Sequence, residues 1–286
     1  MTAASAWEHK VATRLQLALG RGGLSLAYQP KMHLGTGTVT GVEAVARWDD
    51  AELGVVSPAE FVPVAESCGL IDALTQWVLE TAVRQWAEWR EQGSQTHLSV
   101  NVSALNLRDL FLPDHIQRLC MAEGMPCEFL TVEVTESATQ NVMRLLDTLT
   151  RFRIKGIQVS LDDFGTGYSS LLQLRQLPYS EIKIDQCFVK DLAASEEARL
   201  IVKAVIDLAH GMGLVATAEG VEDVETLELL RGIGCDDAQG FLIAEPMDGR
   251  RLVEWLMRFT PPLAAATGPD TGHGQVLRMH HHAAAA

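Results

Sequence analysis

The sequence alternates short β-branched runs with longer amphipathic stretches, and this alternation predicts an α/β fold closed into a (β/α)8 barrel. The predicted strands are largely apolar, as expected of parallel strands that are buried on both faces. Helix-periodic stretches, for example 196–210 and 221–231, alternate with them. This many strand–helix units within about 250 residues fits a closed barrel better than a doubly wound sheet. No glycine-rich dinucleotide-binding motif opens a helix after the first strand.

The chain begins its predicted sheet with an antiparallel hairpin. Residues 24–34 (LSLAYQPKMHL) and 39–48 (VTGVEAVARW) flank the segment GTGT, whose two glycines suit a tight reversal. An antiparallel opening is unusual for an otherwise parallel fold.

Two helices are predicted after the hairpin. Ser57 is a suitable N-cap, Pro58 occupies the first helical position, Glu60 completes a capping box and Gly69 ends the helix. A second helix is predicted over about residues 72–92. Six further strands follow, each next to a helix-periodic stretch: 97–103, 129–136, 157–163, 181–185, 214–220 and 235–240.

These elements divide the chain into three predicted parts. Residues 1–20 form a helical extension, residues 21–260 form the barrel, and residues 261–286 form a flexible or cloning-derived tail. Three consecutive histidines in that tail carry little functional weight.

Composition excludes several classes of protein. A chain of 286 residues with 47% hydrophobic and 21% charged residues is globular. No apolar run approaches the roughly 20 residues of a membrane helix, and the N-terminus does not resemble a signal peptide, so we expect a cytoplasmic chain without membrane insertion. The five cysteines form no CxxC pair, which argues against a disulfide framework and a thiolate zinc site. A formal charge of −14 argues against a nucleic acid polymer as partner, although a small anionic ligand held by metals remains compatible.

Polar residues recur near the carboxyl ends of the predicted strands. In a barrel these ends converge on one mouth, where the active sites of such folds lie. Burying several carboxylates there requires compensating positive charge, and Lys183 and Arg47 alone are too few. The residues at these positions are Glu43, Asn101, Glu133, Asp162, Asp163, Lys183, Asp185, Glu219 and Gln239.

Divalent cations would supply that charge. Carboxylate and amide oxygens without Cys or His favour Mg²⁺ or Mn²⁺. The adjacent Asp162 and Asp163 suit two metals with one carboxylate between them, an arrangement that can activate a water for phosphodiester hydrolysis. Because side chains alternate along a strand, we expect one of the two aspartates to face inward.

Each residue also has a simpler interpretation on its own. Glu43 and Lys183 could be solvent-facing strand residues, and Asn101 a turn former. The pair Glu222–Asp223 could complement a helix dipole, and Asp162–Asp163 could form an Asx turn or a helix cap. Arg47 could stack on Trp48, and Gln239 could be an ordinary satisfied polar residue. Together these interpretations would require many unrelated coincidences at strand ends.

Eight short motifs carry a resemblance to a known family. Through them the chain resembles the EAL family of cyclic di-GMP phosphodiesterases over about residues 24–259. Each motif alone is weak, but their common order and spacing are specific. The motifs are YQP (28–30), EAVARW (43–48), VNVS (100–103), VEVTE (132–136), DDFGTGYSS (162–170), KIDQCFV (183–189), AEGVE (218–222) and AQGFLIAEP (238–246).

The resemblance implies a TIM-like (β/α)8 barrel with one antiparallel strand, and hydrolysis of cyclic di-GMP to linear pGpG with two Mg²⁺ or Mn²⁺ ions. From the coordination argument we also expect inhibition by Ca²⁺, whose larger and looser coordination shell misplaces the water. Implied metal ligands are Glu43, Asn101, Glu133 and Asp162 for one ion, and Asp162, Asp163 and Glu219 for the other.

The same resemblance implies roles for the remaining site residues. Lys183 contacts the nucleophilic water, Glu219 is the candidate base, and Glu43 belongs with them to the catalytic set. Glu136 anchors the DDFGTGYSS loop through hydrogen bonds, and Glu222 is an acidic residue that supports the residues in direct contact with the metals or substrate. The implied substrate-binding residues are Gln29, Arg47, Asn101, Asp185 and Gln239.

One position departs from the family signature, because Glu-Ala-Leu reads Glu-Ala-Val at Val45. We expect a small loss of apolar packing and intact chemistry. A receptor that binds cyclic di-GMP without cleaving it is the alternative function, and an unrelated Mg²⁺-dependent barrel lyase is a more distant one. By family similarity, we also expect a homodimer through the face of residues 161–170 and a regulatory domain outside this chain.

Overall fold

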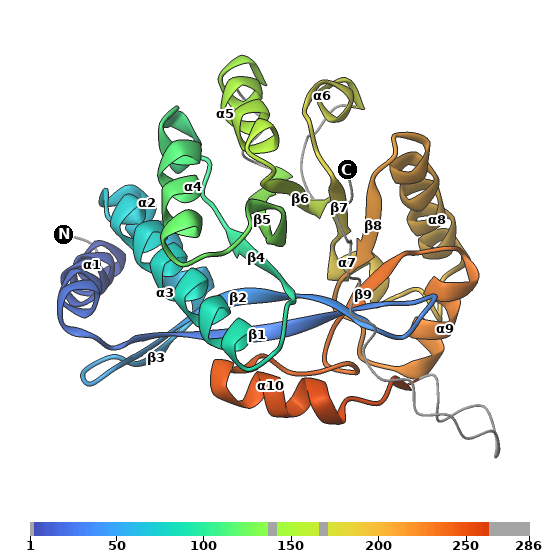
Figure 1. The fold of residues 1–286 in the computed structure, drawn as a ribbon, viewed down its shortest axis with the longest axis horizontal. Helices are drawn as coiled ribbons and strands as arrows, with labels where there is room; N and C mark the ends of the chain where they lie inside the picture. Colours follow the sequence, from blue (N-terminus) through green and yellow to red (C-terminus); the bar gives the residue numbers. More distant parts are fainter. Residues whose placement is uncertain (1–2, 137–141, 166–170, 263–286) are drawn as a thin grey trace, which may run out of the picture.

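The computed structural model describes residues 3–136, 142–165 and 171–262. Within these ranges, eight strands close into a barrel surrounded by helices (Figure 1). The prediction of a TIM-like barrel with one antiparallel strand is confirmed. The predicted tail lies outside the described residues, apart from its first two positions.

The barrel strands follow one another around the bore in a nearly sequential order. β1 pairs with both β2 and β9 in the antiparallel direction, which closes the barrel, whereas the pairs from β2–β4 to β8–β9 are parallel. The strands are β1 (Leu24–His33), β2 (Val39–Asp50), β4 (His97–Asn101), β5 (Leu130–Thr135), β6 (Gln158–Phe164), β7 (Glu181–Ile184), β8 (Val215–Ala218) and β9 (Asp237–Gln239).

Helices cover the outside of the barrel, and α10 lies along the β1–β2 hairpin (Figure 1). Two short strands, β3 (Gly54–Val56) and β10 (Met247–Asp248), pair in the antiparallel direction with β2 and β1, respectively. These two strands and α10 were not among the elements predicted from the sequence. The helices are α1 (Ala3–Arg21), α2 (Pro58–Ser67), α3 (Ile71–Glu91), α4 (Leu112–Ala122), α5 (Val142–Ile154), α6 (Leu171–Gln176), α7 (Gln186–Val189), α8 (Glu196–Gly211), α9 (Val224–Gly232) and α10 (Gly249–Arg258), with 3-10 turns at Asn106–Arg108 and Cys127–Phe129.

Helix ends follow local capping chemistry. The Glu60 carboxylate accepts a hydrogen bond from the Ser57 backbone N–H at 3.1 Å, as the predicted capping box requires. Gly69 takes a φ of +71° just beyond α2, where a side chain would be strained. α9 begins at Val224 and not at the predicted residue 221, because the Asp223 carboxylate accepts the Thr226 N–H at 2.8 Å and caps the helix there.

The interior has two chemically different regions. Strand residues such as Val100, Val132 and Ile182 belong to the apolar core. The bore of the barrel carries polar side chains, and Glu133, Ser160 and Glu181 are paired in register on adjacent strands.

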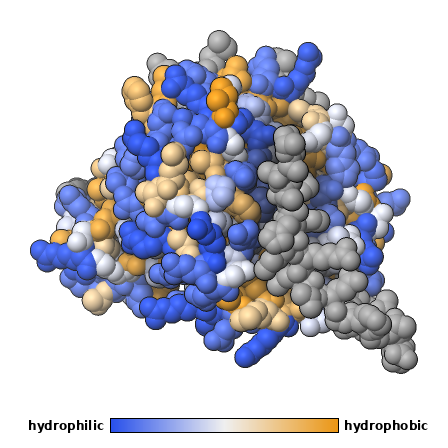
Figure 2. All heavy atoms as spheres, viewed as in Figure 1, coloured by the Kyte–Doolittle hydropathy of each residue, from blue (hydrophilic) through white to orange (hydrophobic). Residues whose placement is uncertain are grey.

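Polar and charged side chains cover most of the face seen in Figure 2, with apolar ones in small scattered patches. Among the described residues, no helix combines the length and apolarity needed to cross a membrane. The polar bore opens at the carboxyl ends of the parallel strands.

Candidate active site

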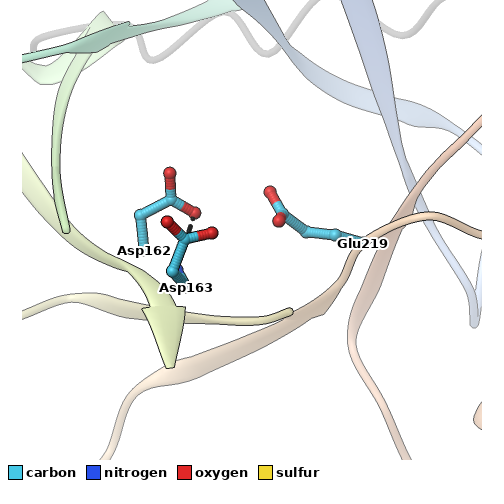
Figure 3. Close-up of side chains that lie close together, drawn as sticks. All are labelled: Asp162, Asp163 and Glu219. Carbon is cyan, nitrogen blue, oxygen red and sulfur yellow. Dashed lines mark hydrogen bonds between the residues drawn. The ribbon is translucent and has the colours of Figure 1, made fainter. Parts of the chain in front are cut away.

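The end of β6 carries the two adjacent aspartates. Asp163 has a φ of +56°, and the pairing of β6 with β7 shifts register between Leu161 and Phe164. This left-handed backbone, which Asp tolerates better than most residues, interrupts the alternation of side chains along the strand. As a result, ligand oxygens of Asp162, Asp163 and Glu219 all lie within 4.8 Å of one another (Figure 3).

Alternation along a regular strand requires one of the two aspartates to face inward, and the irregular end of β6 directs both carboxylates into the site. Figure 3 shows both carboxylates at the end of the β6 arrow, directed toward Glu219. The Asp162 carboxylate accepts a hydrogen bond from the Asp163 backbone N–H at 3.0 Å, which helps to hold the turn.

Lys183 lies at the centre of the acidic cluster, and its side chain is 1% exposed. β7 delivers it into the bore, where its Nζ contacts carboxylates from four other strands or strand ends. The contacts are 2.6 Å to Glu219, 2.8 Å to Glu133, 3.2 Å to Asp162 and 3.3 Å to Glu43.

Glu43 is held by hydrogen bonds as well as by this ion pair. Asn101 donates to one carboxylate oxygen at 2.7 Å, and Gln239 donates to the other at 2.8 Å. The Gln239 amide also donates to Gln29 at 3.0 Å, and Gln29 pairs with Glu43 in the β1–β2 register. Four residues predicted from separate motifs therefore form one connected network.

The cluster contains more carboxylates than ammonium groups, and burial together with this excess raises the pKa values of several of these carboxylates. Burial and the neighbouring carboxylates raise the pKa of Glu219 to about 7, against the lowering effect of Lys183. Burial, followed by Asp162 and Asp185, raises the pKa of Asp163 to about 6. The pKa of Glu133 is raised by burial and by Glu43.

Glu43 and Lys183 show the opposite response. Burial alone would raise the pKa of Glu43, but Lys183, Gln239 and Asn101 together lower it. Burial alone would lower the pKa of Lys183, but the surrounding carboxylates raise it well above its ordinary value. Oxygen-only donors fit hard divalent cations, which would relieve the excess negative charge that helps to raise the pKa values of Glu133, Asp163 and Glu219.

A cavity of about 330 Å³ with a mixed polar and apolar lining borders one side of the cluster. Its lining includes Gln29, Arg47 and Gln239, which the resemblance implies as substrate-binding residues, together with Glu219 and Glu222. It also includes Phe241, which was not singled out. Only its position after the AQG motif could have indicated Phe241.

A larger cavity of about 710 Å³ borders the other side, between α2, α3 and the strand ends. It is mostly apolar, with side chains of α2 such as Ala59 and Val62, and it reaches Asn101 and Asp162. Val45 lines both cavities, so the position that departs from the family signature separates them.

Two predicted residues have partners that bear on their roles. Asp185 caps α7 by accepting the Cys187 N–H at 2.8 Å, and its charge raises the pKa of Asp163. Glu136 is 4% exposed and accepts the Gly165 N–H at 3.0 Å, at the start of the loop that it was predicted to anchor. Residues 166–170 of that loop, and with them half of the predicted dimer face, lie outside the described residues.

Comparisons with known proteins indicate one family. The family model of the EAL domain matches residues 12–246. The chain is 43% identical to cyclic di-GMP phosphodiesterase PA2567 of Pseudomonas aeruginosa over 86% of its own length and 42% of the relative. It is 37% identical to cyclic di-GMP phosphodiesterase PdeR of Escherichia coli, over 86% of this chain and 37% of the relative. The chain thus spans less than half the length of these curated relatives.

Solved structures give the same result. The complex of the PaMucR phosphodiesterase with c-di-GMP is 38% identical, with a TM-score of 0.81, and the match covers 85% of this chain and 99% of that one. The EAL enzyme Bd1971, bound to cAMP and cyclic-di-GMP, is 27% identical with a TM-score of 0.85, over 89% of this chain and 70% of that one.

Proposed function

The chain belongs to the EAL domain family, and we propose that it is a metal-dependent phosphodiesterase that hydrolyses cyclic di-GMP to linear pGpG. The observation that carries the proposal is the acidic cluster around Lys183, which lies between two cavities. A cyclic dinucleotide has two bases flanking its phosphodiesters, and a site with a cavity on either side of the reacting groups suits such a ligand.

The proposed metal ligands are Glu43, Asn101, Glu133 and Asp162 for one Mg²⁺ or Mn²⁺, and Asp162, Asp163 and Glu219 for a second. Divalent ions, when bound, supply an activated water and stabilise the charge that develops on the attacking and leaving oxygens. The grouping of three of these carboxylates within 4.8 Å supports the assignment.

The chain's own residues orient the reactants. Lys183 holds the attacking water by donating a hydrogen bond, and Glu219, which contacts the Lys183 ammonium at 2.6 Å, is the candidate base that accepts the proton of that water. Arg47 clamps a phosphate oxygen, and Gln29 and Gln239 hold the substrate against Glu43.

Nucleotide chromatography after incubation with cyclic di-GMP tests the proposal. With Mg²⁺ or Mn²⁺ we expect pGpG, and with Ca²⁺ we expect binding without hydrolysis. The Lys183→Met variant should bind the nucleotide but lose turnover by about 10²-fold or more, the value of a positioned proton donor. Binding without any pGpG would make the protein a receptor, and no binding would refute both functions.

Three further features stay predictions. They are the cytoplasmic location, the homodimer and a regulatory domain in a longer protein. The partial coverage of the relatives is compatible with the last of them.

A further inference from the structure

A second charged cluster lies in the bore of the barrel, and the proposed reaction does not use it. The Lys31 ammonium of β1 forms an ion pair with the Glu181 carboxylate of β7, and the two side chains are 14% and 7% exposed. Thr217 donates a hydrogen bond to the same carboxylate oxygen of Glu181. Nearby, Asp237 accepts a hydrogen bond from Thr40 at 3.0 Å.

This cluster lies one layer below the acidic site. Glu181 precedes Lys183 by two positions on β7, so both side chains face the bore, about 7 Å apart along the strand. Lys31 is the register partner of Gln239, which donates to Glu43. In the barrel, β9 and β8 separate β1 from β7, so the Lys31–Glu181 pair spans the bore.

The two layers interact electrostatically. Burial would raise the pKa of Glu181, but Lys31 first and also Thr217 and Lys183 lower it. The Glu181 charge is in turn one of the causes that raise the pKa of Glu133. Ser160 lies between Glu133 and Glu181 in the sheet, and no other described residue forms a hydrogen bond with its buried hydroxyl. The layers therefore interact through charge.

We propose that Lys31 and Glu181 are positioning residues whose opposite charges set the electrostatic potential at the metal-binding carboxylates, and hence their affinity for divalent cations. The inference rests on the proposed function, because it requires a metal site above Lys183. Neutralising Lys31 makes that site more negative and tightens cation binding, whereas neutralising Glu181 weakens it. Neutralising both leaves the net charge of the bore unchanged and returns the affinity toward the wild-type value.

The test is Mn²⁺ binding to the full chain without nucleotide, measured by calorimetry and by the spin-resonance signal of free Mn²⁺. The variants are Lys31→Met, Glu181→Gln and the double variant. A unit charge about 10 Å from a divalent ion changes its affinity at least about fourfold, even at the dielectric constant of water. We expect changes of at least this size in opposite directions for the single variants, and about the wild-type affinity for the double variant.

Lys203→Met and Asp207→Asn are matched controls. These residues form an exposed ion pair on α8, with side chains 44% and 62% exposed, and their neutralisation removes the same charges outside the bore. We expect wild-type Mn²⁺ affinity for both, because solvent screens charges at the surface.

A purely structural brace between strands would give a different pattern. Both single variants would then weaken Mn²⁺ binding, and the double variant would bind no better than Glu181→Gln, which would overturn the inference. If circular dichroism shows that Lys31→Met does not fold, the comparison of Glu181→Gln with the double variant decides, because the inference requires the double variant to bind Mn²⁺ more tightly than Glu181→Gln.

Absence of hydrolysis with intact Mn²⁺ binding would count against the proposed function alone. Absence of Mn²⁺ binding in the wild type would refute both the proposed function and this inference.

Discussion

Replacing Lys183 with Met should destabilise the metal-free protein. The variant keeps most of the side-chain volume but removes the ammonium that contacts four carboxylates within 3.3 Å. Removing one partner of a buried ion pair typically costs about 3–5 kcal/mol of unfolding free energy, because the other charge stays buried without compensation.

The cost should depend on pH. The carboxylates can escape the penalty by binding protons, and burial raises the pKa of Glu133 well above its usual range and that of Glu219 to about 7. Both folded-state pKa values lie above the unfolded values, so these protons stabilise the fold at low pH and are lost as the pH rises. The loss comes at a higher pH in the variant, because Lys183 lowers both pKa values in the wild type. We therefore expect a loss of about 3 kcal/mol or more at pH 8 and a smaller loss at pH 6.

Urea denaturation with and without Mg²⁺ measures this effect. Mg²⁺ should restore more stability to Lys183→Met than to the wild type, because the cations replace the missing charge. The exposed i,i+4 pair of Lys203 with Asp207 provides the control, since Lys203→Met should cost only about 0.3–0.5 kcal/mol. Equal stability of wild type and Lys183→Met at pH 8 without metal would refute the reasoning, because it would mean that the cluster is already neutral.

Three other predictions follow from the site. The pKa values of Glu219 and Asp163 are raised to about 7 and about 6, so Mg²⁺ must displace more protons at pH 6.5 than at pH 8.5. Calorimetry in buffers of different ionisation enthalpy should therefore show greater proton release and weaker binding at the lower pH. Val45→Leu adds one methylene between the two cavities and should lower the KM for cyclic di-GMP about threefold to fourfold; an unchanged KM would show that the ligand does not contact this position. Glu136→Gln weakens the acceptor of the Gly165 N–H and should reduce metal affinity by roughly tenfold, with faster deuterium exchange at Gly165, whereas unchanged exchange and affinity would remove the anchoring role.

Which residues gather at the site could be predicted from the sequence. Polar residues recur near the ends of nearly all the predicted strands, and these ends converge in a barrel. From these two facts we expect Glu43, Glu133 and Lys183 to lie close together, and in the structure Lys183 contacts both glutamates. Their pairing was not predictable. The approach of Lys183 to four carboxylates depends on the tilt and stagger of the strands, which a single sequence does not specify.

Local rules failed where the backbone departs from the regular strand. Alternation predicted opposite orientations for Asp162 and Asp163, but the positive φ of Asp163 brings the two carboxylates together. The ion pair of Lys31 and Glu181 could not be predicted from the sequence either. Because β1 runs antiparallel to its neighbours, its carboxyl-terminal end, which carries Lys31, lies in the layer below the site. Whether a strand side chain faces the bore or a helix follows from register, which forms only when the barrel closes.

The two layers of the bore differ in how their charge is balanced. In the lower layer, Lys31 forms an ion pair with Glu181, and Thr40 donates a hydrogen bond to Asp237. In the upper layer, Lys183 is the ammonium that opposes a larger group of carboxylates: Glu43, Glu133, Asp162, Asp163 and Glu219. Compared with the bottom of the barrel, the excess of negative charge is therefore larger at the mouth. Cations that bind there stabilise the folded chain by mass action, so the excess that weakens the metal-free protein is also what gives the site its affinity for divalent metals.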